Sequence, residues 1–310
     1  MLSRTAECLY WMARNMERAE NTARLLDVSL QMSLLHGGGS AELMVPLDVT
    51  GQTESYRERY GEPMAEAVLR ALAIDADNPA SIFNCIRYAR ENARVVRGKI
   101  TSEMWEQLNA TWLEMREWAR RDLDAATASA LLDWVKERSH LFRGVTYGTI
   151  LRNDAFHFSR LGTFIERADN TARILNVKFK QIKDSEPVSE NILDYYQWAA
   201  LLRSVSAFEA YRDIYRDRIT PQRVAELLIL RPDVPRSLRA AFDEISQILP
   251  NIEGNTGHPA KRLAAELKAR LTYGHIDDIF AEGLQRYLDH FIADTTQLGF
   301  AIHRSYLEAA

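Results

Sequence analysis

The sequence has few of the residues, and none of the long apolar runs, that mark several common classes of protein. Among 310 residues there are only two cysteines, Cys8 and Cys85. Two are too few for a disulfide framework or a tetrahedral thiolate metal site, which favours a reducing, cytoplasmic environment. No apolar run reaches about 18 residues, so we expect no membrane span. The opening residues carry charges inside their apolar stretch, so we expect no signal peptide.

Nucleotide, metal and catalytic signatures are missing as well. The chain has no GxxxxGK[ST] phosphate-binding loop. A di-metal carboxylate bundle needs ExxH pairs on facing helices, but Glu17-x-x-Glu20 and Glu166-x-x-Asp169 lack the histidine, and the seven histidines are scattered. No pairing of a nucleophile with a base is recognisable in the motifs. We therefore expect no cofactor, no metal and no catalytic residue.

The charge balance argues against nucleic acid as a partner. The chain has 39 Lys and Arg residues against 43 Asp and Glu residues, for a net charge of −4. A nucleic-acid-binding surface is usually basic. Apolar residues make up 46% of the chain, which is normal for a folded core and too high for disorder.

Hydrophobic spacing indicates helices throughout, with no alternating β pattern and no Asn-Gly or Asp-Gly hairpin signal. We predict an all-α bundle of about a dozen helices. The stretch 36–52 is the most loop-like, and 180–191 holds the matching place later in the chain. The segments with helical patterns are 5–34, 79–97, 101–118, 125–142, 154–180, 191–217, 235–248, 259–272 and 276–307.

One charged octet occurs twice. ERAENTAR spans Glu17 to Arg24 and ERADNTAR spans Glu166 to Arg173, with seven identities in eight positions. Weaker matches follow at slightly larger offsets: ESYR at 54–57 aligns with EAYR at 209–212, and NPASI at 78–82 aligns with VPRSL at 234–238. Small loop insertions account for the drift in offset. We predict a single domain over 1–310, built from duplicated halves of about 1–150 and 151–310 related by a pseudo-two-fold axis.

The octet has two physical interpretations. On a helix, Glu20 and Arg24 form an i, i+4 pair, and Asp169 with Arg173 keeps that geometry. A solvated charged face is one interpretation. The other is a buried polar seam, in which Glu and Arg side chains of the two copies meet, because both copies retain the octet while much of the surrounding sequence differs. Such a seam could fix how the halves dock or could hold a carboxylate or phosphate through arginine forks.

The candidate binding residues come from the two octets and the helix before the first. Tyr10 and Trp11 are adjacent, so they cannot both face one core, and they could line a groove. The full set is Tyr10, Trp11, Arg14, Glu17, Arg18, Asn21, Arg24, Glu166, Arg167, Asn170 and Arg173.

Three stretches resemble the bacterial alpha-E proteins, a family named for a helical domain with a repeated Glu-Arg motif. They are LSRTAECLYWMARNMERAENTARLL, FSRLGTFIERADNTARIL and YYQWAALLRSVSAFEAYRDIY, so the resemblance covers nearly the whole chain. The family often has arginine before the Glu-Arg pair in both copies; here Arg14 is present but Thr163 stands in the second copy. Members are uncharacterised and tend to be encoded beside, or fused to, circularly permuted ATP-grasp proteins, with transglutaminase-like peptidases often nearby. The resemblance implies a pathway that builds or trims peptides or amide-linked tags.

Three hypotheses for function follow. The first is a non-catalytic helical partner that binds a circularly permuted ATP-grasp-type enzyme, or its anionic peptide substrate, through the Glu-Arg seam. The second is an enzyme of the same pathway that acts on an amide or peptide at that seam. The third is a structural dimerisation scaffold, so a homo-oligomer is possible. The first leads because no nucleophile–base pair or metal set is recognisable.

Overall fold

The computed structural model describes residues 1–35, 39–184, 193–253 and 257–308. Within these ranges it contains fifteen α-helices and no strand, which confirms the all-α prediction. A single 3₁₀ turn, Leu249–Asn251, and a π-helical turn, His303–Leu307, complete the regular elements. The helices are α1 Ser3–Leu35, α2 Ser40–Thr50, α3 Thr53–Tyr60, α4 Ala65–Ala73, α5 Ile82–Val95, α6 Ser102–Trp118, α7 Ala125–Thr149, α8 Asp154–Asp184, α9 Leu193–Ser204, α10 Phe208–Tyr215, α11 Pro221–Leu230, α12 Leu238–Ile248, α13 His258–Tyr273, α14 Ile276–Glu282 and α15 Leu284–Ile302.

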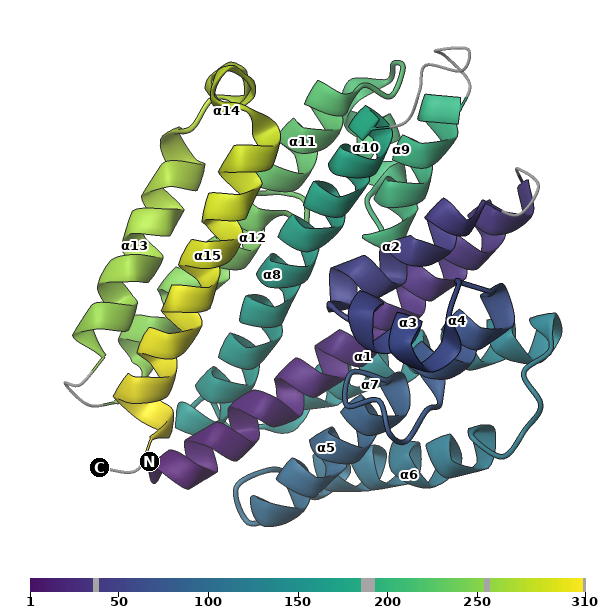
Figure 1. The fold of residues 1–310 in the computed structure, drawn as a ribbon. Helices are drawn as coiled ribbons and strands as arrows, with labels where there is room; N and C mark the ends of the chain where they lie inside the picture. The colour runs from purple at the N-terminus through teal and green to yellow at the C-terminus, as the bar shows by residue number, and fades with distance from the viewer. Residues whose placement is uncertain (36–38, 185–192, 254–256, 309–310) are drawn as a thin grey trace.

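The two longest helices, α1 and α8, pack against each other at the centre of the molecule (Figure 1). α2, α5 and α7 pack on α1, while α12 and α15 pack on α8. Each of the two long helices carries one copy of the octet near its middle. The helices predicted over 5–34 and 154–180 therefore pack together, as the buried-seam interpretation of the octets requires.

A glycine sits at the closest approach of these two helices. A Cβ placed on Gly162 of α8 would lie 2.2 Å from the backbone oxygen of Tyr10 in α1. No side chain fits at that distance, so the crossing requires glycine. Alanines of the octets, Ala19 and Ala168, are also fully buried. Small residues thus let the two backbones come close enough for the octets to meet.

The hydrophobic interior has two parts. The smaller core takes its buried residues from positions 19–135 alone. The larger core runs from Ala6 to Leu307 and includes residues on both sides of position 150. The two halves of the chain therefore share a continuous apolar interior.

The predicted loop at 36–52 is wrong over 40–50, where α2 forms. Leu43, Val45, Leu47 and Val49 of α2 are buried. Their burial against α1 and α8 outweighs the local cost of Pro46, which lies inside the helix. In the second half, α8 continues through 180–184, and the rest of the predicted loop at 180–191 lies outside the described residues.

Two segments predicted as continuous helices are broken. The 191–217 pattern divides into α9 and α10, with Ser206 at a φ of 53° between them. The 276–307 pattern divides at Gly283, whose φ of 102° ends α14 before α15 begins. Both breaks place a residue in the positive-φ region, which apolar periodicity does not report.

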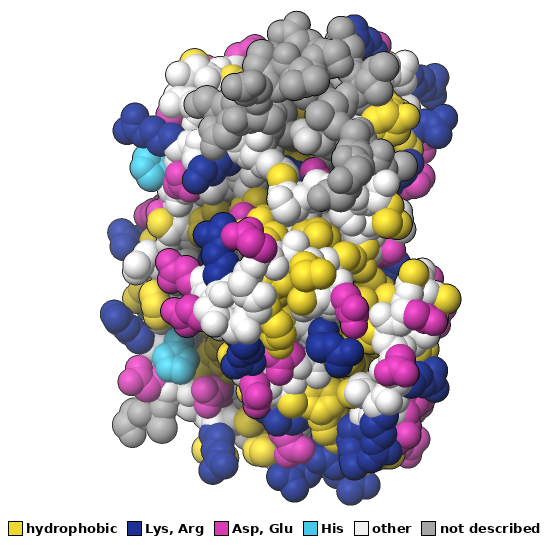
Figure 2. Space-filling model, turned by 45° about the vertical axis from the view of Figure 1, so that its right-hand side comes forward, with side chains coloured by type: hydrophobic (Ala, Val, Ile, Leu, Met, Phe, Trp, Pro, Cys, Tyr) yellow, Lys and Arg dark blue, Asp and Glu magenta, His cyan; other side chains and the backbone are white. Residues whose placement is uncertain are grey.

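The surface carries mixed charge. On the face drawn in Figure 2, basic and acidic side chains are interspersed, with hydrophobic side chains between them. Among the described helices, none is long and apolar enough to span a bilayer.

Candidate functional site

The two octets meet through reciprocal arginine–carboxylate forks. Arg18 of α1 donates to Glu166 of α8, with Nε–Oε1 at 2.6 Å and Nη2–Oε2 at 2.9 Å. Arg167 of α8 donates to Glu17 of α1, with Nε–Oε1 at 2.9 Å and Nη2–Oε2 at 3.0 Å. Glu17 is 1% exposed and Glu166 is 6% exposed. The solvated-face interpretation is therefore wrong for these two glutamates, and the buried seam is confirmed.

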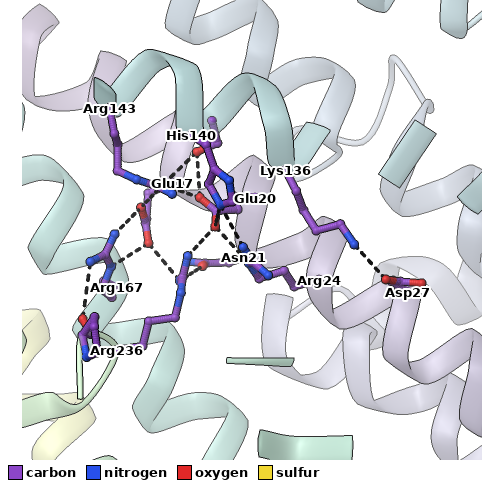
Figure 3. A network of polar contacts seen from close by, with 12 residues as sticks. Glu17, Glu20, Asn21, Arg24, Asp27, Lys136, His140, Arg143, Arg167 and Arg236 are labelled. Atoms are coloured by element: carbon purple, nitrogen blue, oxygen red, sulfur yellow. Dashed lines mark hydrogen bonds and ion pairs between the residues drawn. The ribbon is translucent and has the colours of Figure 1, made fainter. Parts of the chain in front are cut away.

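Two further arginines, Arg236 and Arg143, close the seam around Glu17 (Figure 3). Arg236, which comes just before α12, donates from Nη1 to Glu17 Oε1 at 3.0 Å and to Asn21 Oδ1 at 2.8 Å. It also donates from Nη2 to Glu20 Oε1 at 2.5 Å. Arg143 of α7 donates to Glu17 Oε2 at 3.1 Å and also pairs with Glu20. We call this group the Glu17 cluster; its members are Glu17, Glu20, Asn21, Arg143, Arg167 and Arg236.

The surrounding guanidinium groups keep both carboxylates of the Glu17 cluster ionised. Burial alone would raise the pKa of Glu17, but the charges of Arg167 and Arg236 outweigh it and lower the pKa. Burial would likewise raise the pKa of Glu20. The hydrogen bond from His140, together with the charges of Arg236 and Arg143, lowers it instead. Neither carboxylate is positioned to take up a proton near neutral pH.

Glu166 is paired differently. Besides Arg18, it contacts Arg14 of α1, whose Nη2 lies 2.8 Å from Glu166 Oε2. Arg14 also donates to the Tyr10 hydroxyl at 3.2 Å, and its guanidinium lies 4.8 Å from the centre of the Trp11 ring. Burial opposes ionisation here too, yet Arg18 and Arg14 lower the pKa of Glu166 to about 2. We call Glu166, Arg14, Arg18 and Tyr10 the Glu166 cluster.

The last arginine of each octet forms the predicted i, i+4 pair. Nε of Arg24 lies 2.9 Å from Glu20, and Nε of Arg173 lies 2.8 Å from Asp169. The environments differ, because the Arg24 side chain is 15% exposed and the Arg173 side chain is 38% exposed. The second octet therefore ends on a more open surface than the first.

Two cavities open beside the Glu166 cluster. The first, the Trp11 cavity, has a volume of about 440 Å³ and lies between α1, α8 and α15. The second, the Ala80 cavity, has a volume of about 360 Å³ and lies between α1, α8, the end of α2 and the segment before α5. Both are lined by Arg18, Asp169 and Arg173, so these three side chains form a wall common to the two cavities.

The predicted site residues fall into two groups. Eight of them line these cavities: Tyr10, Trp11, Arg14, Arg18, Asn21, Glu166, Asn170 and Arg173. The other three do not. Glu17 and Arg167 belong to the Glu17 cluster, and Arg24 lies beside it, bonded to Glu20 and with its Nη2 atom 3.0 Å from Nε2 of His140.

Several polar residues of this region escaped the sequence analysis. Arg143, His140 and Ser139 come from α7, where no repeated motif marks them. Arg236 had a weak signal, because it lies in the VPRSL stretch that answers NPASI at 78–82. Ala80 occupies the corresponding place in the first half. The match between the two stretches therefore gave no indication that an alanine in one half is replaced by a charged arginine in the other.

The comparisons with known proteins agree with the resemblance. The family model for Alpha-E, described as a predicted alpha-helical domain with a conserved ER motif, matches residues 1–307. The chain belongs to the Alpha-E family. Curated relatives include "Uncharacterized protein Rv2567" of Mycobacterium tuberculosis and "Uncharacterized protein Mb2597" of Mycobacterium bovis, each 24% identical over 309 residues.

The match covers 92% of this chain but only 34% of either relative. The chain thus spans about a third of the length of the curated relatives that it matches. No solved structure matches it significantly. The repeated ER dipeptides of this Alpha-E chain, Glu17-Arg18 and Glu166-Arg167, are the four residues of the reciprocal forks.

Proposed function

We propose that this Alpha-E chain is a non-catalytic binding protein that holds an anionic, carboxylate-bearing peptide in the groove made by the Trp11 and Ala80 cavities. One observation carries the proposal. Arg18 and Arg173 each satisfy an acidic partner on the same chain, yet Nη1 of Arg18 and both Nη atoms of Arg173 make no hydrogen bond within the described residues. Both side chains are about one-third exposed and line both cavities.

Arginine forks of this kind suit a carboxylate. A guanidinium presents paired donors in a plane, which matches the two oxygens of a carboxylate group. Because Glu166 and Asp169 already fix Arg18 and Arg173, little side-chain entropy is lost when the remaining donors engage a ligand. Pre-organisation of this kind favours binding over a purely structural role for the open side of the seam.

The Glu17 cluster favours binding over catalysis. The alternative of an amide- or peptide-processing enzyme needs a carboxylate that reaches the substrate and exchanges a proton. Glu17 is sealed from solvent, and arginines hold its pKa below the ordinary value. A general base works best with a pKa near the operating pH.

We further propose that the partner supplying the peptide is a circularly permuted ATP-grasp-type enzyme in an amide-forming pathway of the cytoplasm. The family resemblance supports this part of the proposal. Co-expression of the two proteins, followed by co-purification and a search for new amide product, tests it. Separate elution of the two proteins in low salt contradicts it.

The order of helices supports a proposal of internal duplication with pseudo-two-fold symmetry. α1 and α8 exchange reciprocal forks, and α5 and α12 each pack on their own octet helix after a serine N-cap, Ser81 or Ser237. α3 and α10 are both eight residues long and each buries one tyrosine. An experimental structure in which α1–α7 does not superpose on α8–α15 contradicts the duplication.

Titration calorimetry tests peptide binding directly. Acetyl-Glu-Glu-Glu is expected to bind and its glutamine counterpart with an amidated end is not, with affinity falling as salt rises. Arg173→Gln should weaken binding by about 1.5–3 kcal/mol, the value of a hydrogen bond to a charged group. Arg70→Gln is the matched control, because Arg70 also forms an i, i+4 pair, with Glu66, but lies away from both cavities. Equal binding by both variants, or no heat with the acidic peptide, rejects the proposal.

A further inference from the structure

The Ala80 cavity contains a buried donor with no partner. Asn21 is 3% exposed and lines this cavity, and its Nδ2 makes no hydrogen bond among the described residues. The orientation of the amide is determined, because Arg236 can only donate and therefore faces Oδ1. Leaving a buried N–H unpaired is unfavourable, because the group has lost its hydrogen bonds to water. Nδ2 has less than 1 Å² of exposed surface, so a ligand oxygen in the cavity satisfies it only when the amide turns toward the cavity.

The space itself arises from one difference between the halves. In the Glu17 cluster, the guanidinium of Arg236 fills the place beside Glu17, Glu20 and Asn21. In the matching stretch of the first half the residue is Ala80, which lines the cavity and contributes only a methyl group. The place that the Arg236 side chain fills beside the first octet is therefore left as a cavity at Ala80, beside the second octet.

The Trp11 cavity is of a different kind. Its walls include the apolar side chains Trp11, Ile165, Phe300 and Leu307, and Phe300 is 53% exposed. Gly299 also lines it, and a Cβ added there would meet no atom within 4 Å. The apolar side chains and the free space at Gly299 suit an apolar or aromatic group of a ligand.

The donors of the Ala80 cavity favour a carboxylate over a phosphate. Asn21, Arg18 and Arg173 offer planar amide and guanidinium donors. Glu166 and Asp169 line the same cavity with negative charge. A singly charged carboxylate is repelled less by them than a phosphate of nearly twice the charge.

We propose that the groove binds a peptide by its C-terminal residue, with the terminal carboxylate in the Ala80 cavity and an apolar or aromatic side chain of that residue in the Trp11 cavity. Arg18, Asp169 and Arg173 line both cavities, so they border the terminal residue on its carboxylate side and on its side-chain side. This assignment rests on the proposed function. It adds which end of the peptide is bound and which kind of side chain the terminal residue carries.

Calorimetry with acetyl-Gly-Phe, acetyl-Gly-Phe-amide and acetyl-Gly-Gly tests both parts. The free acid with phenylalanine should bind, and loss of either the carboxylate or the ring should weaken binding by about tenfold or more. Asn21→Asp keeps an oxygen for Arg236 but replaces the Nδ2 donor with an acceptor. It should weaken binding of the free acid by about tenfold or more and leave binding of the amide unchanged.

Filling each cavity in turn gives tests that do not depend on Asn21. Ala80→Arg should abolish binding of acetyl-Gly-Phe, whereas Ala76→Arg adds the same charge at an exposed position of the same segment and should have no effect. Gly299→Leu should remove the preference for phenylalanine over glycine. Gly148→Leu, at an exposed helical glycine with open space, is its control.

The outcomes separate this inference from the proposed function. Binding of acetyl-Glu-Glu-Glu without any preference for a terminal carboxylate or an aromatic ring overturns the inference alone. Unchanged binding in Ala80→Arg, with a melting temperature equal to that of Ala76→Arg, also overturns it. Absence of binding by every peptide overturns both.

Discussion

The Glu17 and Glu166 clusters are built from nearly identical octets, yet the cavities beside them differ. Arg143 and Arg167 of the Glu17 cluster line a cavity of about 170 Å³, whereas the Glu166 cluster borders two cavities of about 440 and 360 Å³. We call the first the closed side and the second the open side. Arg143 of α7 and Arg236, in the turn before α12, both reach Glu17, which is 1% exposed. Glu166 has Arg14 in addition to Arg18; it lines the Ala80 cavity, and the two arginines line the Trp11 cavity. The difference lies in residues outside the repeated octet. A repeated motif can therefore serve architecture on one side and leave room for a ligand on the other.

The largest expected effect follows removal of a carboxylate from the closed side. Glu17→Ala leaves the buried Arg167 without its carboxylate partner and removes one of the two glutamates that pair with Arg236 and Arg143, so it should lower the free energy of unfolding by about 3–5 kcal/mol. Glu166→Ala should cost less, because the Arg18 side chain is 34% exposed and can turn to water. Denaturant titration measures both. Glu66→Ala, at an exposed ion pair, is the control; equal losses for Glu17 and Glu166 would remove the distinction between the clusters.

The pH dependence of stability should reveal the open side. The pKa of Glu166 falls from an ordinary 4.5 to about 2 in the folded chain. A lowered pKa contributes stability that is present above the unfolded value and is lost as the pH falls through the folded value. Glu166 should thus contribute about 3 kcal/mol at neutral pH, lost progressively between about pH 4.5 and 2.

Denaturant titrations at a series of acidic pH values measure this contribution. Glu166→Gln should flatten the curve over that window relative to the original chain, while Glu66→Gln should leave its shape unchanged. If the free energy of unfolding of Glu166→Gln varies with pH as it does in the original chain, Arg14 and Arg18 do not stabilise the ionised Glu166 carboxylate.

A smaller effect is expected at the crossing that brings the octets together. Gly162→Ala places a methyl group against the backbone oxygen of Tyr10, so α1 and α8 must separate. Overpacking of this kind costs about 1–3 kcal/mol. Gly144→Ala is the matched control, because its Cβ would meet no atom within 4 Å, and it should stabilise the helix slightly. Thermal unfolding of the two variants is the measurement, and equal melting temperatures would contradict close packing at Gly162.

Local signals were sufficient for most of the helices and for the meeting of the octets. Helical periodicity predicted α1, α8 and the all-α class, and the repeated charges predicted that Glu17 and Glu166 would be buried beside arginines. Tertiary packing explains the failures: α2 is held by buried side chains despite Pro46. Arg143 and Arg236 converge on Glu17 from 126 and 219 positions away, and no local pattern records such convergence.

The smallest effect compares the same octet position in the two clusters. Arg24 and Arg173 both pair with an acidic residue four positions earlier. Arg173→Met should change the free energy of unfolding by at most about 0.5 kcal/mol, because exposed i, i+4 pairs contribute little. Arg24→Met should cost more, about 1 kcal/mol or above, because its partner Glu20 is 0% exposed and loses a charged hydrogen bond.

Paired measurements of stability and peptide binding on these two variants sharpen the comparison. Arg173→Met should bind acetyl-Glu-Glu-Glu about tenfold or more weakly while its stability hardly changes. Arg24→Met should show the reverse, because Arg24 lines neither cavity. If Arg24→Met weakens binding as much as Arg173→Met, the ligand does not occupy the open side, and the difference between the two clusters is one of packing alone.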